Sequence, residues 1–272
     1  MEEASMKVSN RFTTLAGAVA LGLASGAVYA SCEDLPDHGA LQDALNAAVL
    51  AELSGLNHDM WATLVDRDGK VCAVAFSGDD RGSQWPGSRV ISAQKANTAN
   101  AFSLDDLALS TANLYSAVQP GGSLYGLQHS NPVDTAVAYG GNGHAGGNAN
   151  NYGQANDPLV GDFVGGVNVF GGGLGLYNGS IIGGLGVSGD TSCADHMIAW
   201  RVRDNLNLDN LVGVSGVGPS ADRRDNIVFD IVGGVSAGGF GHPTCLNVDA
   251  DGNPDNSNAE GTAYAATLPA VQ

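Results

Sequence analysis

Basic residues are scarce in this sequence. Only 11 of the 272 residues are Lys or Arg, whereas 28 are Asp or Glu, so the formal net charge at pH 7 is −17. A chain of this charge repels the phosphate backbone of nucleic acids and the headgroups of anionic membranes. The composition therefore argues against both nucleic acid and membrane surfaces as partners.

Several short motifs for metal or redox chemistry are also missing. No C-x-x-C spacing occurs, which argues against a zinc site and against a thioredoxin-like redox site. The absence of C-x-x-C-H excludes covalent attachment of a c-type haem. No two of the six histidines form an H-x-x-x-H pair, so no metal triad is visible in the sequence. These histidines are His38, His58, His129, His144, His196 and His242.

Glycine, by contrast, is abundant. The chain contains 40 glycines, about twice the usual share of roughly 7%, but it lacks the strict G-X-Y period of collagen. Because 43% of the residues are hydrophobic, the chain is not disordered by the criterion of low hydropathy. Its length suits one large or two small domains with a sizeable core.

The first 30 residues have the pattern of a secretory signal peptide. Lys7 and Arg11 precede an apolar run over residues 15–28, and Val28-Tyr29-Ala30 is similar to an A-x-A cleavage site. The apolar run is short for a membrane span. We therefore expect cleavage after Ala30 and a periplasmic or extracellular mature protein, with a buried N-terminal helix as the alternative.

Four cysteines follow the expected cleavage site. An even count in an exported chain predicts two disulfides, and three pairings are open. We favour Cys193–Cys245, which would tie a C-terminal extension to the core, and Cys32–Cys72, which would tie the mature N-terminus to an early strand.

The periodicity of the first half predicts helices and a hairpin. Apolar residues spaced by four indicate a helix over 35–53. The runs 60–65 and 70–76 flank an Asp-Arg-Asp-Gly turn and predict a hairpin. We expect a second helix over 88–104, capped by Ser88, and a further helix that ends near residue 118.

The second half alternates loops with strands. Residues 139–157 are rich in Gly and Asn, as is typical of a loop, and 163–170 is expected to form a strand. Asn178-Gly179 is a strong signal for a hairpin between two further strands. A helix is expected over 193–206, two more strands over 212–245, and a polar, mobile tail thereafter.

Two glycine motifs are similar to catalytic or nucleotide-binding fingerprints. Gly184, Gly186 and Gly189 fit G-x-G-x-x-G, but a hairpin precedes them instead of a βαβ unit, which favours close packing as their role. Residues 234–238 fit the G-x-S-x-G nucleophile elbow. No helix follows this serine, and His242 precedes every later acid, so a Gly-rich strand or turn is favoured.

An acidic segment near the C-terminus has the spacing of a calcium loop. Five oxygen-bearing residues fall at positions 1, 3, 5, 7 and 12 of an EF-hand-like pattern. They are Asp249, Asp251, Asn253, Asp255 and Glu260. Pro254 stands where the pattern needs Gly, and no flanking helices are expected, so the alternative is a solvated acidic tail.

Three blocks, in order along the chain, carry a family resemblance. They are AQKANTANAF (93–102), QPGGSLYGL (119–127) and VFGGGLGLYNGSIIGGLGVSGDTSCADHMIA (169–199). Together with the preceding WATLVDRDGKVCAVAF hairpin, they resemble the GlcG/HbpS-like haem-binding family, also called the haem-degrading domain. The same domain recurs at the C-terminus of PduO-type corrinoid adenosyltransferases. The resemblance covers about residues 35–211.

This resemblance implies an α+β fold, a five-stranded antiparallel sheet flanked by helices on both faces, in a chain that forms homo-oligomers. On this basis residues 31–211 form the GlcG/HbpS-like domain, with a Gly/Asn-rich insertion at 131–163. Residues 212–272 form a C-terminal extension with an acidic tail.

The resemblance also implies haem or a related tetrapyrrole as cofactor. A single histidine suffices as an axial ligand of haem iron. His129 follows a Gly-rich turn and an aromatic residue, and His196 lies in the first turn of an expected helix, so these two are the favoured candidates. Lys95 matches the family helix, and its ammonium is a candidate partner for a haem propionate. A surface or capped histidine and a surface salt bridge are the respective alternatives, and a further alternative is that the insertion covers the site and abolishes binding.

These observations predict an exported haem-binding protein that takes part in haem sensing, storage or degradation. An accessory protein or small-molecule enzyme of unknown substrate on the same fold is one alternative. A cofactor-free structural or assembly protein is the other, and the sequence leaves enzymatic activity undecided.

Overall fold

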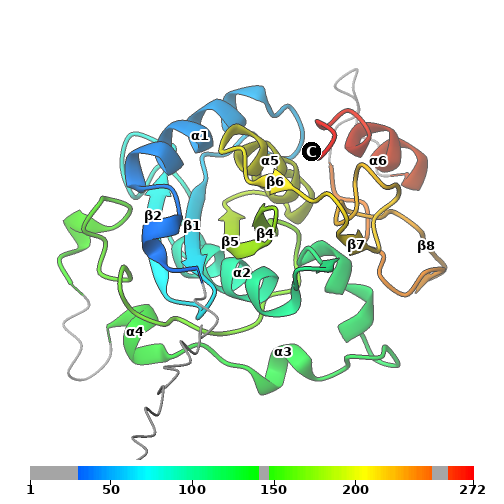
Figure 1. Cartoon of the computed structure of the whole chain (residues 1–272), viewed down its shortest axis with the longest axis horizontal. Helices are drawn as coiled ribbons and strands as arrows, with labels where there is room; N and C mark the ends of the chain where they lie inside the picture. The colour runs from blue at the N-terminus through cyan, green and yellow to red at the C-terminus, as the bar shows by residue number, and fades with distance from the viewer. Residues whose placement is uncertain (1–29, 141–146, 247–256) are drawn as a thin grey trace, which may run out of the picture.

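The computed structural model describes residues 30–140, 147–246 and 257–272 (Figure 1). At its centre lies a five-stranded sheet with the order β2-β1-β5-β4-β6. The strands are β1 (Trp61–Asp66), β2 (Val71–Phe76), β4 (Gly173–Asn178), β5 (Ile181–Ser188) and β6 (Asp209–Asn210). The expected α+β fold is confirmed, and so are the two hairpins predicted from the Asp66–Gly69 and Asn178-Gly179 turns.

One strand pairing differs from the wholly antiparallel sheet that was expected. The short edge strand β6 pairs parallel to β4, whereas every other pair in this sheet is antiparallel. The chain reaches β6 through a helix instead of a tight hairpin, so the connection does not impose an antiparallel partner. The sheet is therefore mixed at this edge.

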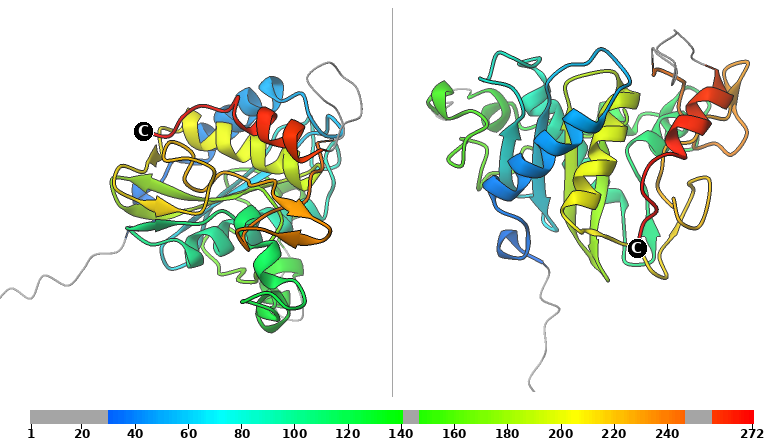
Figure 2. Two further views of the ribbon diagram at one scale, coloured as in Figure 1. Left: turned by 90° about the vertical axis from the view of Figure 1, so that its right-hand side faces the viewer. Right: turned by 90° about the horizontal axis from the view of Figure 1, so that it is seen from above.

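Helices cover both faces of the sheet. Helices α1 (His38–Ala51) and α5 (Ser192–Asn205) pack together on one face, and α2 (Ser88–Phe102) lies across the other (Figure 2). Leu41 and Leu45 of α1 are fully buried, as the four-residue spacing predicts. They belong to a core that also includes Trp200 of α5 and Leu185 of β5.

Glycines of β5 allow α2 to approach the sheet closely. A Cβ atom on Gly186 would overlap the carbonyl oxygen of Ser92, and one on Gly184 would overlap that of Ala96. The backbone of α2 thus rests directly on the strand, which only residues without a side chain permit. This contact confirms close packing as the role of the G-x-G-x-x-G glycines.

Three local expectations are wrong. Residues 163–170 do not form a strand, because Gly165 and Gly166 adopt positive φ angles of 66° and 80° that interrupt extended backbone. Ser88 is the first residue of α2 and not its cap, since Gly87 occupies the N-cap position. The helix expected to end near residue 118 is replaced by β3 (Leu107–Ala108) and two 3₁₀ turns, Ala112–Leu114 and Ser116–Val118.

The remaining elements are short. Two helices, α3 (Leu127–Ser130) and α4 (Thr135–Tyr139), and the 3₁₀ turn Ala149–Asn151 lie within or next to the Gly/Asn-rich insertion. The extension contributes the two-residue strands β7 (Ser215–Gly216), β8 (Ile231–Val232) and β9 (Val235–Ser236).

The C-terminal tail ends in ordered structure, unlike the mobile tail that was expected. Helix α6 (Asn258–Ala265) is capped by Ser257, whose side chain accepts a hydrogen bond from the backbone of Glu260. Ala265 and Leu268 are buried in the main core together with Ile227 and Phe229 of the extension. Apolar burial therefore holds the end of the chain against the sheet domain.

Both predicted disulfides are confirmed. Cys32 is bonded to Cys72 of β2, and Cys193 of α5 is bonded to Cys245 of the extension. Among the described helices, none is both long and apolar enough to cross a membrane. The predicted signal peptide lies outside the described residues.

Candidate functional site

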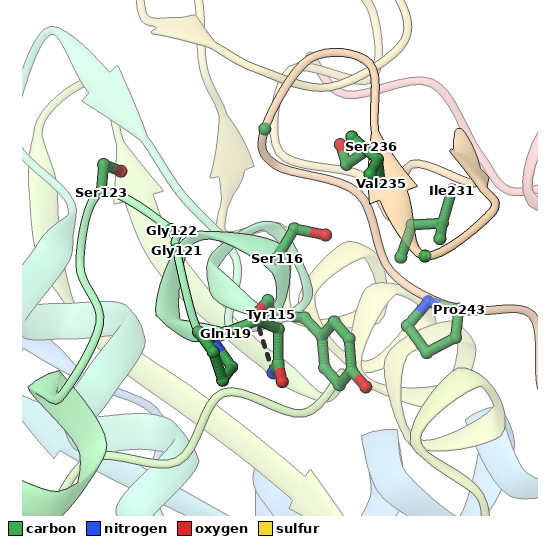
Figure 3. Close-up of a pocket in the computed structure, with 13 residues that line it drawn as sticks. Tyr115, Ser116, Gln119, Gly121, Gly122, Ser123, Ile231, Val235, Ser236 and Pro243 are labelled. Carbon is green, nitrogen blue, oxygen red and sulfur yellow. Dashed lines mark hydrogen bonds between the residues drawn. The ribbon is translucent and has the colours of Figure 1, made fainter.

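A cavity of about 670 Å³ lies between residues 115–123 and the C-terminal extension (Figure 3). Its volume falls within the range of roughly 300–1,000 Å³ that is typical of small-molecule pockets. Tyr115, Ile231 and Pro243 give it apolar surface, and Ser116 and Gln119 supply polar groups. None of the described lining residues carries a charge.

Hydrogen bonds hold the two walls of this cavity together. Both the backbone N–H and the hydroxyl of Ser116 donate to the carbonyl oxygen of Gly241, at 3.2 and 2.6 Å. The β8–β9 hairpin is fixed to the following loop by Ser236, whose hydroxyl oxygen accepts from the backbone of Gly241 at 2.9 Å. Ser236, the serine of the G-x-S-x-G motif, thus lies in a short strand, and its hydroxyl holds the neighbouring backbone. This agrees with the Gly-rich strand or turn predicted for the motif.

His242 lies directly behind the cavity wall. Its ring contacts that of Tyr115, with 5.0 Å between the ring centroids. Its Nδ1 lies 2.7 Å from the carbonyl oxygen of Pro243, which can only accept, so Nδ1 carries the proton. Its Nε2 therefore presents a lone pair, 3.2 Å from the hydroxyl of Ser192. Burial lowers the pKa of His242 to about 4, so the ring is neutral at neutral pH.

His196 lies in the same buried region. Its Nε2 lies 3.0 Å from the side-chain oxygen of Asn226, while its buried Nδ1 has no hydrogen-bond partner within the described part of the chain. Burial lowers the pKa of His196 to about 4. The disulfide between Cys193 of the same helix and Cys245 brings the segment that contains His242 to the start of α5.

Lys95 of α2 reaches across the sheet to Asp195 of α5. Its Nζ lies 2.6 Å from the carboxylate and donates a second hydrogen bond, of 3.1 Å, to the carbonyl of Val187. Both side chains are buried. Burial lowers the pKa of Lys95 and raises that of Asp195 to about 6, whereas their mutual attraction favours the charged pair. Lys95 already has partners for its charge inside the protein.

The structure therefore brings together two of the three cofactor-binding residues predicted from the sequence. His196 and Lys95 lie close together, since Lys95 pairs with Asp195, which precedes His196 on α5, and the two side chains lie beside the neighbouring residues Gly171 and Gly172. His129 lies apart from these two residues, exposed on the short helix α3. A role for each in cofactor binding stays a prediction.

His242 was not favoured by the sequence analysis. The signal that could have found it is Cys245, three residues further along the chain. The predicted bond to Cys193 places this segment against the first turn of α5, where His196 also lies. The predicted pairing therefore already implied that His242 lies near His196.

The predicted calcium ligands are mostly outside the described residues. Asp249, Asp251, Asn253 and Asp255 are in this category, and only Glu260 is described, in the first turn of α6. Nothing in the described part of the chain supports a calcium site, which stays a prediction.

Comparisons with known proteins give the following matches. Residues 40–203 match the family model described as haem degrading protein HbpS-like. No curated protein matches. The Klebsiella pneumoniae protein ORFY is 24% identical, with 68% of this chain and 97% of that chain covered and a TM-score of 0.44. The PduOC chain of a PduOC:heme complex is 24% identical to this chain. The match covers 64% of this chain and 96% of the PduOC chain, with a TM-score of 0.43. HbpS is 16% identical to this chain. The match covers 67% of this chain and 93% of the HbpS chain, with a TM-score of 0.39.

Proposed function

Because this chain belongs to the HbpS-like family of haem-degrading proteins, we propose that it binds haem or a related tetrapyrrole in the cavity between residues 115–123 and 231–243. The observation that carries this proposal is the state of His242. Its Nδ1 proton is held by a backbone carbonyl, its Nε2 keeps a lone pair, and its ring contacts that of Tyr115, which lines the cavity. Such a second hydrogen bond is typical of histidines that bind metals.

The residues of the cavity fit a haem group. Its volume of about 670 Å³ and its apolar surface suit a flat macrocycle, and one histidine suffices as axial ligand. The side-chain amide of Gln119 donates one N–H to the carbonyl of Tyr115, and its second N–H can donate to a propionate. The ring of Tyr115 contacts that of His242, so we expect the Tyr115 side chain to rotate when His242 coordinates iron.

The earlier candidates take supporting roles in this proposal. Lys95 holds Asp195, whose other carboxylate oxygen accepts the backbone N–H groups of Gly189 and Asp190 just before α5, and His196 follows Asp195 on that helix. A propionate would have to break the ion pair between Lys95 and Asp195 to bind that ammonium. His129, exposed on α3, is the alternative iron ligand at a separate surface.

The wider role remains the one inferred from the sequence: an exported protein for haem sensing, storage or degradation that forms homo-oligomers. The two disulfides support export, because such bonds persist in oxidising compartments. An enzyme with a small-molecule substrate and a cofactor-free assembly protein stay the alternatives.

A haem titration of residues 31–272, followed by absorbance, tests the proposal. We expect a saturable Soret shift, and His242→Ala should weaken binding roughly 10-fold or more, as loss of metal-site partners does. His196→Ala should have a smaller effect, and His129→Ala should have none. A titration no different from that of an unrelated acidic protein would refute haem binding. A selective loss in His129→Ala would instead move the site to α3.

A further inference from the structure

The geometry around the second disulfide points to a metal site that the oxidised protein does not offer. We propose that Cys193, Cys245 and His242 bind one thiophilic divalent cation, such as Zn²⁺, once a dithiol has reduced the Cys193–Cys245 bond. This inference does not depend on haem binding.

The three ligand groups already lie together. The two sulfur atoms and one ring nitrogen of His242 are all within 4.8 Å of one another. In a tetrahedral zinc site, Zn–S bonds of about 2.3 Å place two thiolates roughly 3.8 Å apart. Reduction therefore requires only a small separation of the two sulfur atoms to make room for the ion.

The surroundings of these ligands suit a metal. The Nδ1 proton of His242 is held by Pro243, which leaves Nε2 as the free donor nitrogen. The backbone N–H of Cys193 donates to the sulfur of Cys245 at 3.1 Å, at the N-terminus of the 14-residue helix α5. This N–H donor and the helix N-terminus favour a thiolate over a thiol.

A fourth oxygen donor is also at hand. The hydroxyl of Ser192 lies 3.2 Å from Nε2 of His242 and 3.4 Å from the sulfur of Cys245. Two cysteines and one histidine with an open or oxygen-occupied fourth position form a recognised zinc donor set. Cys193 is buried, but Cys245 is only half-buried, so a small dithiol can reach this end of the bond.

The other disulfide is a weaker candidate. Cys32, Cys72 and Asp66 also lie within 4.8 Å of one another. However, one oxygen of Asp66 already accepts the backbone N–H groups of Asp68 and Lys70, which hold the β1–β2 turn. The other oxygen lies 3.7 Å from the sulfur of Cys32, but a carboxylate suits hard cations, whereas the imidazole of His242 suits zinc.

The reduction and the metal binding balance without a further reagent. The dithiol is oxidised to its cyclic disulfide, the S–S bond of Cys193–Cys245 breaks, and two protons pass to the cysteine sulfurs. When the cation binds the two thiolates, these protons leave to solvent. Thiol–disulfide exchange with a small-molecule disulfide, which is reduced to its two thiols, restores the Cys193–Cys245 bond of the empty site.

The test uses residues 31–272 with Cys32→Ser and Cys72→Ser, so that only the second disulfide remains. The protein is reduced with a dithiol, which is then removed under nitrogen, and Zn²⁺ binding is measured by competition with a chromogenic chelator. Co²⁺ serves as a second probe because thiolate coordination gives it a charge-transfer band. We expect one equivalent of metal on the reduced protein and none on the oxidised protein.

Three variants identify the ligands. His242→Ala should lower the zinc affinity of the reduced protein roughly 10-fold or more, whereas the exposed His129→Ala should leave it unchanged. Cys193→Ser with Cys245→Ser should abolish zinc binding but keep His242 for haem, which separates this proposal from the previous one.

Four results would overturn the proposal. They are equal zinc binding by oxidised and reduced protein, no binding after reduction, an affinity indifferent to His242→Ala, and loss of the fold on reduction as seen by circular dichroism.

Discussion

The buried His196 should make the stability of this protein depend on pH. Burial lowers its pKa from 6.5 to about 4, so the unfolded chain binds a proton at a pH where the folded protein does not. Because the pKa of His196 is lower in the folded than in the unfolded state, the stabilisation of the folded state by neutral His196 is fully present above pH 6.5. It is lost progressively as the pH falls towards 4.

The size of this effect follows from the two pKa values. Linkage predicts that His196 alone reduces the free energy of unfolding by about 2 kcal/mol between pH 7 and pH 5. Replacing it by Gln removes this titration. His196→Gln should therefore be less stable than the wild type at pH 7, but it should lose about 2 kcal/mol less on acidification.

Urea unfolding at the two pH values, followed by circular dichroism, measures this difference. His129→Gln is the matched control, since His129 is exposed and should leave the pH dependence unchanged. Carboxylates titrate equally in all three proteins, so they cancel in the comparison. Identical pH dependence in wild type and His196→Gln would refute the inference that His196 is buried in its neutral form.

Two further predictions concern packing and charge. Gly186→Ala should destabilise the protein by about 1–3 kcal/mol because the added methyl overlaps backbone of α2. A methyl group added at Gly87 meets nothing within 4 Å, so Gly87→Ala should be near neutral. Thermal melts of the two variants measure this difference. Asp225→Asn should cost about 3–5 kcal/mol because it leaves the buried charge of Arg203 without its partner. The exposed Asp222→Asn should leave the stability almost unchanged, and equal losses in the two variants would contradict this account.

Much of the sheet and its covering helices could be predicted from local patterns. The spacing of Leu41 and Leu45 and the Asn178-Gly179 turn each specify an element through short-range geometry. The run 163–170 was predicted wrongly because tertiary contacts decide its conformation. Its valines favour a strand, but the positive φ angles of Gly165 and Gly166 are settled by tertiary contacts. In one of these, Asn97 of α2 donates a hydrogen bond to the carbonyl of Gly166.

The candidate site was harder to predict because it joins segments far apart in the sequence. Tyr115, Ser192 and His242 carry no shared motif, and their proximity depends on burial of the extension against the main core. An isolated histidine has no second ligand at a characteristic distance in the sequence, so no motif reveals it. His196 could be selected from its place at the start of a helix, whereas the position of His242 follows only from the Cys193–Cys245 bond.

The C-terminal extension is the reason why family membership alone does not define this site. The family model ends at residue 203, yet Arg203 itself forms a bidentate, buried pair with Asp225 of the extension at 2.6 and 2.9 Å. The extension then supplies Ile227 and Phe229 to the main core. Residues 231–243 of the extension form one wall of the cavity, and the segment around residue 119, inside the family match, forms the other wall. His242 belongs to the extension and contacts Tyr115 of the opposite wall. A ligand of this cavity therefore contacts residues that the family model does not cover. For that reason, the binding preferences of this protein should follow from its extension as much as from its family fold.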